Sequence, residues 1–392
     1  MPGPYIRVLQ NLYYGQTAQV KTDKRSRTFD VQRGTKQGDP LSSLLFNALL
    51  EKMMSSAKTS FRRKKLGIQL GGTDESRLTN LRFADDVLLA ARSLKQLCEM
   101  LMIVQHEASQ CGLELHPDKT KIISSTNREG RPRASHVQVG SMKIEILARA
   151  SSVKYLGRQI TFENYHELEL SNRIRAGWAR FTQNKEELVN KRYSLNDRLR
   201  LFESVISPTV LYGSECWTMS KNMENMLRTA QRKMLRSILG HGRRRIANDA
   251  EDSGSEHEVS EPHVHEDRHD ELEPWVDWIK RVTHSVENSL EKLKIKTWVE
   301  QARRRKWRWA QKTYCEGKHK WTDAVLMWNP QVHFDPPKPT ARRKQAAPKK
   351  RWTDELEHFV KNISQANTTL KDVCADPNFW VTYEKDFMKT ER

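Results

Sequence analysis

The sequence has few cysteines and no long apolar stretch, and both shortages limit the kind of protein it encodes. Its five cysteines are scattered, and none belongs to a Cys-x-x-Cys pair: Cys98, Cys111, Cys216, Cys315 and Cys374. An odd number at irregular spacing argues against a disulfide framework or a zinc site, so we expect reduced thiols in an intracellular protein. No apolar run reaches the ~18 residues that a membrane span needs, so we expect no membrane partner.

Acidic residues are also in deficit. The chain has 49 Asp and Glu against 68 Lys and Arg, which gives a net charge of +19 and a pI near 9.7. Such a surface attracts polyanions and favours nucleic acid as a partner. The first residues, MPGPYIRVLQNLYYG, lack the basic and apolar regions of a secretory signal. A chain of 392 residues indicates two or three domains.

Two adjacent aspartates, Asp85 and Asp86, stand between apolar runs in LRFADDVLLA. The two runs have strand character, and the short polar connection between them predicts a hairpin with both carboxylates at its tip. Like charges at such short range repel each other, although a solvated turn tolerates them. A pair of divalent cations would use them, because Mg²⁺ prefers carboxylate oxygens. The doublet alone does not decide between these interpretations.

The segments around the doublet have their own patterns. Upstream, Pro40 begins a helical pattern whose apolar positions are Leu41, Leu44, Leu45, Ala48, Leu49 and Met53. The preceding RGTKQGD contains glycines that allow close approach of a nucleotide or template. Downstream, SLKQLCEMLMIVQHEASQCG predicts an amphipathic helix that stops at Gly112. LELHPDKTKIIS then predicts a turn into a strand, and VKYLGRQI predicts another strand with a glycine kink.

In their order along the chain, these blocks resemble the palm of reverse transcriptases, in particular those of RTE-like, non-LTR (LINE-type) retrotransposons. RGTKQGDPLSSLLFNALL resembles the Gly-Gln-Gly block and its helix, FADD the catalytic hairpin, GLELHPDKTKI the next motif and VKYLGRQI the primer-grip hairpin. Further on, ISPTVLYGSECWTMSKNMENMLRTAQRKMLRSILG resembles the helical thumb. The resemblance implies an α+β fold, in which a partial palm precedes a helical thumb and a basic helical C-terminal region.

The resemblance also implies a role for each matched residue. Asp85 and Asp86 would bind Mg²⁺, with Mn²⁺ as an alternative, and Asp86 would be the weaker or outer ligand. Lys119 would neutralise or protonate the leaving pyrophosphate, with Lys121 as its rival. The residues expected at the template and nucleotide are Arg33, Gly34, Gln37, Gly38, Asp39, Pro40, Phe83 and Ala84. Those expected at the primer end are Tyr155, Leu156 and Gly157.

One family feature has no counterpart at its expected place. The family has a further metal-bridging aspartate on a palm strand upstream of the Gly-Gln-Gly block, whereas only Asp23 and Asp30 precede the block here. Asp23 lies in a basic turn, and both residues are too near the block. We therefore expect a reverse transcriptase that lacks its fingers and first palm motif, and that is inactive alone unless a separate fragment supplies them. Its other partners would be an RNA template, a DNA primer and deoxynucleoside triphosphates.

The remaining sequence suggests three further regions after a palm at 1–162. A helical thumb is expected at 163–245, with a break near Ser194, and Arg173, Arg175, Arg180 and Lys185 as candidates for contact with a duplex or for a solvated face. The acidic segment 246–274 predicts a disordered linker. Its histidines, His257, His263, His265 and His269, would hold a metal only as a minor alternative.

The last region, 275–392, is basic and rich in tryptophan. Trp298, Trp307 and Trp309 alternate with Arg303, Arg304, Arg305 and Arg308, a pattern that favours either base stacking with phosphate contacts or a buried tryptophan seam under a basic face. Thr353 is expected to cap a helix with Glu355 and Glu357 in its first turn. The family and the basic runs together suggest a nuclear protein. The alternative to a polymerase is a nucleic-acid-binding remnant without catalysis.

Overall fold

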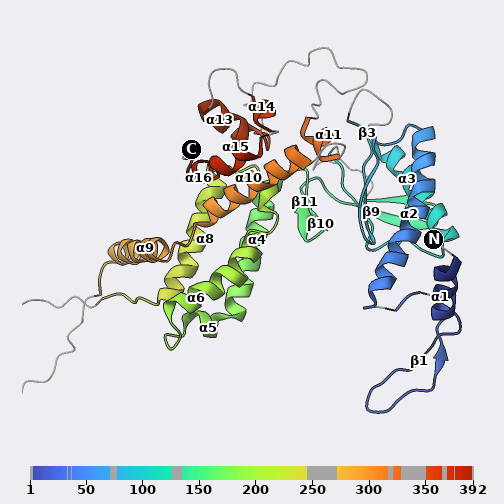
Figure 1. The fold of residues 1–392 in the computed structure, drawn as a ribbon, viewed down its shortest axis with the longest axis horizontal. Coiled ribbons are helices and arrows are strands. Elements are labelled where there is room, and N and C mark those ends of the chain that lie inside the picture. The colour runs from blue at the N-terminus through green and yellow to red at the C-terminus, as the bar shows by residue number, and fades with distance from the viewer. Residues whose placement is uncertain are drawn as a thin grey trace, which may run out of the picture. The chain divides into compact units, whose positions relative to one another are not determined.

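The computed structural model describes most of the chain (Figure 1). The described residues are 3–32, 34–36, 38–70, 77–125, 135–244, 272–316, 321–327, 350–363, 369–374 and 376–390. They form two compact units, one up to Ser151 and the other from Ser152 onwards. None of the described helices is long and apolar enough to cross a membrane.

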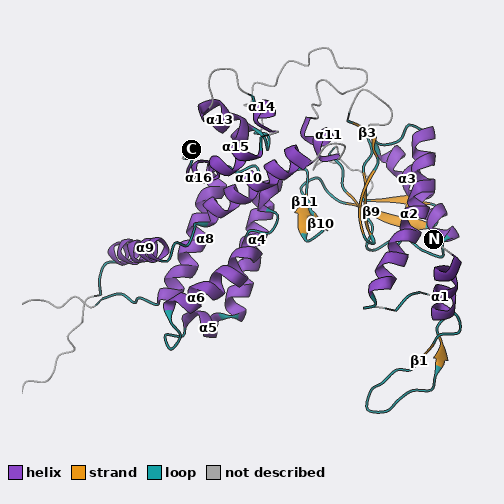
Figure 2. Ribbon diagram, in the orientation of Figure 1, coloured by secondary structure: helices purple, strands orange, loops and turns teal. Residues whose placement is uncertain are grey.

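The N-terminal unit combines helices with short strands, and the C-terminal unit is almost wholly helical (Figure 2). The fold is therefore α+β, as the sequence predicts. The elements of the N-terminal unit are α1 (Gly3–Tyr13), β1 (Thr17–Ala18), β2 (Phe29–Asp30), α2 (Pro40–Arg63), β3 (Ile68–Gln69), β4 (Arg77–Leu78), β5 (Asn80–Phe83), β6 (Asp86–Leu89), α3 (Leu94–Gln110), β7 (Lys121–Ile122), β8 (His136–Val139) and β9 (Met142–Ile146).

Helix α2 begins where the sequence predicts. The Asp39 carboxylate accepts a hydrogen bond from the Leu41 N–H at 3.0 Å, and Pro40 occupies the first turn. This cap satisfies a backbone donor that has no partner inside the helix. The expected apolar face is only partly correct, because Leu44 is 66% exposed. The apolar residues that α2 buries lie later in the helix: Leu50, Met53, Met54, Ala57 and Phe61.

Helix α3 is the centre of the N-terminal unit. Ser93 caps its start and Gly112 follows its end with a φ of +70°, as expected for a glycine stop. One side of α3 packs on α2 through Met100 and Val104. Its other side, with Leu101, covers the sheet of order β7–β9–β8, in which β7 is parallel to β9 and β8 is antiparallel to it.

The C-terminal unit begins with a hairpin and continues as helices. Its elements are β10 (Val153–Tyr155), β11 (Arg158–Ile160), α4 (Tyr165–Gln183), α5 (Lys185–Val189), α6 (Leu195–Leu201), the π-helix η2 (Phe202–Ile206), α7 (Ser207–Val210), η3 (Ser214–Cys216), α8 (Lys221–Leu239), α9 (Trp275–Lys292), α10 (Trp298–Glu316), α11 (Trp321–Met327), α13 (Asp354–Ile363), α14 (Leu370–Cys374), α15 (Pro377–Thr382) and α16 (Glu384–Lys389). Ser194 caps α6, so the expected break is present, and a second break occurs at Asn184.

The segment VKYLGRQI is a hairpin. The prediction of one strand with a kink was therefore wrong, whereas the hairpin that the family resemblance implied is confirmed. Tyr155 pairs with Arg158 across a two-residue turn in which Leu156 and Gly157 both have positive φ, 48° and 75°. Two positive φ values are the signature of a type I′ turn, whose twist matches the flanking strands. The sequence pattern missed this turn because leucine is unusual at such a position.

The core of the C-terminal unit is built around aromatic side chains. Phe202 and Trp298 are fully buried and stack with ring centroids 5.7 Å apart, and the Trp298 indole donates to the Ser207 Oγ at 2.7 Å. Trp307 is also buried, against Trp380 and Phe387. Base stacking is therefore excluded for Trp298 and Trp307, which belong to the core, whereas Trp309 remains 37% exposed.

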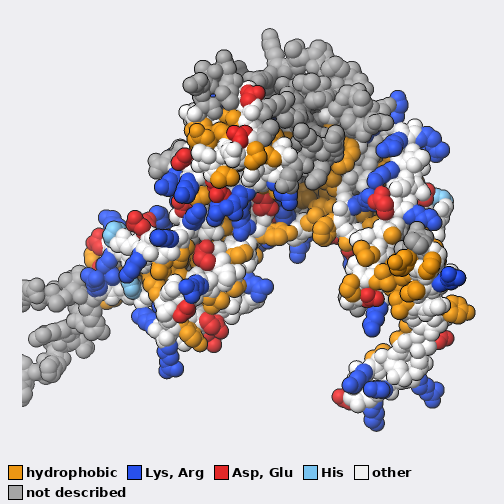
Figure 3. Space-filling model, in the orientation of Figure 1, with side chains coloured by type: hydrophobic (Ala, Val, Ile, Leu, Met, Phe, Trp, Pro, Cys, Tyr) orange, Lys and Arg blue, Asp and Glu red, His pale blue; other side chains and the backbone are white. Residues whose placement is uncertain are grey.

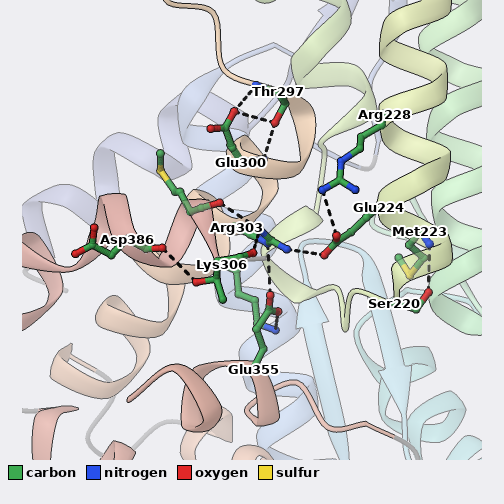
Figure 4. Close-up of polar contacts among 12 residues, drawn as sticks. Ser220, Met223, Glu224, Arg228, Thr297, Glu300, Arg303, Lys306, Glu355 and Asp386 are labelled. Atoms are coloured by element: carbon green, nitrogen blue, oxygen red, sulfur yellow. Dashed lines mark hydrogen bonds and ion pairs between the residues drawn. The ribbon is translucent and has the colours of Figure 1, made fainter. Parts of the chain in front are cut away.

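Buried charges join three helices of this unit (Figure 4). Arg303 of α10 donates to Glu224 of α8 at 2.7 Å, and Lys306 pairs with Glu355 of α13 at 3.0 Å. Arg303 and Lys306 are only 4% and 2% exposed. Since a buried charge requires a partner, these two residues serve the fold. Arg303 therefore neither contacts phosphates nor lies on a solvated face, the two alternatives that the sequence left open. Thr353 directly precedes α13, and Glu355 and Glu357 lie in its first turn, as expected, whereas the cap by the Thr353 side chain stays a prediction.

Most of the predicted acidic linker, with its histidines, lies outside the described residues, and disorder there stays a prediction. Its last three residues are described and belong to the folded C-terminal unit. Glu273 pairs with Arg281 at 2.8 Å and accepts a hydrogen bond from the Arg244 N–H. The Arg281 side chain and the Arg244 backbone together lower the pKa of Glu273 to about 2. The predicted linker therefore ends earlier than 274.

The buried pair between Arg303 and Glu224 predicts a large effect on stability. Replacing Glu224 by glutamine leaves Arg303 as a buried cation without its nearest carboxylate, and we expect a loss of about 3–5 kcal/mol in the free energy of unfolding. Urea titration followed by circular dichroism measures it. The matched control is Glu287→Gln, because Glu287 pairs with Arg232 at the surface, where both side chains are more than 40% exposed, and a change below about 1 kcal/mol is expected. Equal losses in both variants would contradict this interpretation.

His166 makes the C-terminal unit sensitive to acid. Burial, with repulsion from Arg158 and Lys306, lowers its pKa from 6.5 to about 4, and its Nδ1 accepts from the Thr218 N–H at 3.4 Å. Between pH 4 and pH 6.5 the unfolded chain binds a proton at this histidine that the folded chain does not bind. The stabilisation that the neutral His166 gives the fold is therefore complete above pH 6.5 and is lost as the pH falls towards 4. As the pH is lowered from 6.5 to 4, the urea midpoint of unfolding should fall less steeply in His166→Gln than in the exposed control His284→Gln. Parallel curves for both variants would refute the assignment.

Candidate active site

The Asp-Asp doublet lies at the tip of the β5–β6 hairpin, as the sequence predicts. Phe83 pairs with Asp86, which leaves Ala84 and Asp85 as the two turn residues. Asp85 and Asp86 are both exposed, and so is Phe83, at 65%. Within the described residues, the side-chain oxygens of Asp85 and Asp86 form no hydrogen bond and no ion pair. The hairpin therefore presents two adjacent, accessible carboxylates.

The turn at this tip is strained. Ala84 has a φ of 51°, a conformation that costs an L-residue with a Cβ roughly 1–2 kcal/mol, and it is the first of the two turn residues. Such strain persists only where the surrounding structure holds the backbone, and it often occurs at functional sites. Glycine is the usual residue at a positive φ. Because alanine occupies this position, the sequence did not indicate the unusual backbone conformation.

An ion pair that the sequence did not reveal anchors the hairpin. Arg82 of β5 contacts Glu51 of α2 at 2.5 Å, and this hydrogen bond from Arg82 lowers the pKa of Glu51. Leu89 at the end of β6 packs against the apolar residues of α2 and α3. In the described part of the chain, β5 and β6 form a sheet of two strands, so both outer edges of the hairpin lack a neighbouring strand.

The glycine-rich block lies in the loop before α2. Gly34 and Gly38 have φ values of +93° and +91°, and among the described residues, apart from the chain neighbours, none lies within 4 Å of a Cβ built on either glycine. The loop therefore needs glycine for its backbone conformation and leaves the space beside both residues open. Asp39 and Pro40 form the helix cap described above. Arg33 and Gln37 lie outside the described residues, so their predicted contacts stay predictions.

The structure separates the two candidate lysines. Lys121 lies on β7 opposite Glu145 of β9, and the two side chains form an ion pair at 2.5 Å. Lys119 is exposed in the preceding turn and makes no ion pair within the described residues. This arrangement favours Lys119 as the cation available to a ligand. The sequence alone could not identify Glu145 as the partner of Lys121, because the pairing depends on strand register.

The proposed primer-grip residues belong to the C-terminal unit. A fully buried carboxylate, Glu169 of α4, accepts from the Gln159 N–H at 2.7 Å and from Arg173 at 2.8 Å, and thereby holds the β10–β11 hairpin on α4. The Leu156 carbonyl accepts from the Tyr212 hydroxyl at 3.0 Å, and the Gly157 carbonyl accepts from Arg173. Arg173 is therefore an internal residue of the protein and was wrongly grouped with the exposed Arg175, Arg180 and Lys185.

The described residues do not complete a metal site. No group of three or more His, Cys, Asp or Glu side chains among them is arranged to hold a metal ion. Asp85 and Asp86 come from one turn, whereas two divalent cations roughly 3.5–4 Å apart need carboxylates on more than one side. Asp30, the other candidate, pairs with Thr17 in the separate β1–β2 ribbon. The two carboxylates alone therefore do not fit a two-metal centre.

Comparison with known proteins supports the reverse transcriptase resemblance. Residues 2–160 match the family model described as reverse transcriptase (RNA-dependent DNA polymerase). A Caenorhabditis elegans protein described as transposon-derived is 36% identical over 167 residues, which are 42% of this chain and 57% of that protein. The Pol polyprotein of the retrotransposable element R2DM of Drosophila melanogaster is 31% identical over 169 residues, 41% of this chain and 15% of the polyprotein.

A third relative is the Pol polyprotein of an R2 element of Popillia japonica, which is 31% identical over 145 residues, 36% of this chain and 19% of the polyprotein. The chain thus spans little more than half of the C. elegans relative and less than a fifth of these Pol polyproteins. Three kinds of observation therefore agree: an exposed Asp-Asp hairpin, the blocks around it and these relatives. Residues 2–160 form a reverse transcriptase domain of the kind found in non-LTR retrotransposons.

Proposed function

We propose that this chain takes part in RNA-templated DNA synthesis for retrotransposition, with an RNA template, a DNA primer and deoxynucleoside triphosphates as its ligands. The observation that carries the proposal is the accessible Asp85–Asp86 pair at the tip of a hairpin inside a reverse transcriptase domain. In this proposal residues up to 162 serve as the palm and residues 163–245 as a helical thumb, as in RTE-like elements.

The roles of individual residues follow from their accessibility. Asp85, at the turn itself, would be a direct ligand of a divalent cation, and Asp86, which begins β6, would be the second ligand of the pair. Mg²⁺ is the expected ion, because it prefers hard carboxylate oxygens and accompanies phosphates. Lys119 would contact the triphosphate. Tyr155, Leu156 and Gly157 would contact the primer, with the turn carbonyls held by Tyr212 and Arg173.

Synthesis would require a carboxylate in addition to those of the described residues. Two cations at about 4 Å repel each other by several kcal/mol even in a medium of intermediate dielectric, so a carboxylate that bridges them is needed. Asp85 and Asp86 occupy one side of such a centre. We therefore propose that these 392 residues alone do not polymerise, and that a fingers and first-palm segment added upstream would complete the site.

The second candidate function is nucleic-acid binding without catalysis. The net charge of +19 favours it, as does the incomplete set of metal ligands among the described residues. The two functions differ in an observable way. A polymerase fragment gains activity when its missing motif is supplied, whereas a binding protein does not.

Primer extension separates these two functions. The 392-residue chain should extend no primer on an RNA template with Mg²⁺ or Mn²⁺, and a fusion that supplies the fingers and first palm motif of a related reverse transcriptase should restore synthesis. In the fusion, Asp85→Asn should reduce extension below detection, because it removes a metal ligand. Asp23→Asn is the matched control: it makes the same change at an exposed aspartate outside the hairpin and should leave extension unchanged.

Two outcomes would contradict the proposal. If the 392-residue chain extends a primer and Asp85→Asn stops it, another carboxylate completes the site, and Asp30→Asn identifies whether it is Asp30. If the fusion folds and remains inactive, the chain is the nucleic-acid-binding protein of the second candidate function.

Binding itself should depend steeply on salt. The positive charge predicts that phosphate contacts dominate, and each contact releases condensed counterions. With about six phosphate contacts, the affinity for an RNA–DNA duplex should fall on the order of a thousandfold between about 50 mM and about 200 mM salt. Fluorescence anisotropy of a labelled duplex measures this dependence, with a neutral polysaccharide as a competitor that should have no effect. Affinity that is constant across this range would exclude binding through the phosphates.

A further inference from the structure

A basic pocket opens in the C-terminal unit, in the region from α9 to α10. Its cavity measures about 500 Å³, and five cationic side chains contribute to its lining: Lys294, Lys296, Arg304, Arg305 and Arg308. One carboxylate, Glu203, also lines it. All of these residues lie within one compact unit. Lys and Arg side chains gather over α10 in the space-filling view (Figure 3).

Three elements bring these side chains together. Arg304 and Arg308 are four residues apart on α10 and therefore project from the same side of the helix. Lys294 and Lys296 come from the connection between α9 and α10. Glu203 comes from the π-helix η2, a form that is rare and frequently lies at functional sites.

The carboxylates near the pocket do not cancel its charge. Among the described residues, Arg304 and Arg308 both pair with Glu384, at 3.1 and 2.6 Å. Glu203 accepts from Ser207 at 2.7 Å and from Gln301 at 2.9 Å, so each of its oxygens already accepts one hydrogen bond. Burial raises the pKa of Glu203. Five cations thus face two carboxylates, and the pocket keeps an excess of positive charge.

Lys294 has an unusual backbone conformation for a lysine. It follows the end of α9 with a φ of 54°; its N–H donates to the Glu291 carbonyl at 3.0 Å, and the Ile295 N–H donates to the Leu290 carbonyl at 2.8 Å. Glycine is the usual residue at this helix stop. The Lys294 side chain is exposed and makes no hydrogen bond or ion pair with any described residue. No contact of the side chain with a described residue therefore offsets the backbone strain at Lys294. The ammonium group is available to a ligand.

We infer that this pocket is a binding site for the phosphate groups of a nucleic-acid backbone. Arginine forks bind phosphate oxygens in pairs, and lysines add mobile point charges, so the mixture suits a chain of phosphates. The cavity has the size of a site for a whole organic ligand and exceeds what one small anion fills. The inference extends the proposed function to a region outside the reverse transcriptase domain, which ends at residue 160.

Lys294→Gly tests the inference without endangering the fold. Glycine suits the positive φ of this position, so the urea midpoint should stay equal or rise. The affinity for an RNA–DNA duplex should fall several-fold, and the slope of log K against log salt should decrease by about one unit, because one phosphate contact is lost. A variant that binds with unchanged affinity and slope would overturn the inference.

The chain offers a closely matched control. Lys65 follows the end of α2 with a φ of 53°, its N–H donates to the Arg62 carbonyl, and the Leu66 N–H donates to the Phe61 carbonyl. Lys65→Gly therefore removes the same charge from the same helix-stop geometry, but outside the pocket, and should leave affinity nearly unchanged. Equal losses of duplex affinity in both variants would mean that net charge alone explains the effect, and would contradict binding in the pocket. Absence of any binding by the unmodified chain would instead refute the proposed function, and the pocket with it.

Two further measurements identify the ligand. Glu203→Gln removes the carboxylate charge, so it should tighten binding of the duplex, whereas loss of affinity would indicate a purely structural role. Titration calorimetry with inorganic pyrophosphate tests a free phosphate as the ligand. If Lys294→Gly weakens pyrophosphate binding and leaves duplex binding unchanged, the pocket serves a small anion and the assignment to a nucleic-acid backbone is wrong.

Discussion

The ion pair between Arg303 and Glu224 determines how the C-terminal unit uses its most basic helix. Helix α10 carries a run of arginine and lysine residues, yet Arg303 and Lys306 point into the protein, where Glu224 and Glu355 hold them (Figure 4). A buried cation without a carboxylate costs several kcal/mol, so α8, α10 and α13 have to meet in one arrangement. That arrangement also directs Arg304, Arg305 and Arg308 to the pocket.

The two turns that carry the expected catalytic and primer-grip residues share a physical feature. Ala84 and Leu156 both adopt positive φ without being glycine. Each turn is supported by its own unit: Arg82 pairs with Glu51 beside the first, while Tyr212 and Arg173 hold the carbonyls of the second. Such support fixes the backbone of both tips, and a fixed tip can present its side chains or carbonyls to a substrate in one geometry.

The N-terminal unit leaves much of its apolar surface exposed. Helix α1 buries none of its residues, and Leu44 and Phe83 are each about two thirds exposed. In the described part of this unit the β5–β6 hairpin pairs only with itself. Leu89 and the pair between Arg82 and Glu51 are two of the contacts that join the hairpin to the rest of the unit. The carboxylates are presented by a small sheet rather than by the middle of a large one.

The sequence by itself determined the local features: the cap at Asp39 and Pro40, the glycine stop after α3, and the hairpin at Asp85 and Asp86. Each depends on residues only a few positions apart, so its pattern is legible in the chain. The type I′ turn at Leu156, the pairing of Lys121 with Glu145, and the burial of Arg303 and Trp307 depended on the tertiary structure. A basic, tryptophan-rich helix has the same pattern whether its arginines meet phosphates or buried carboxylates, and only the position of Glu224, 79 residues earlier in the chain, decides between them.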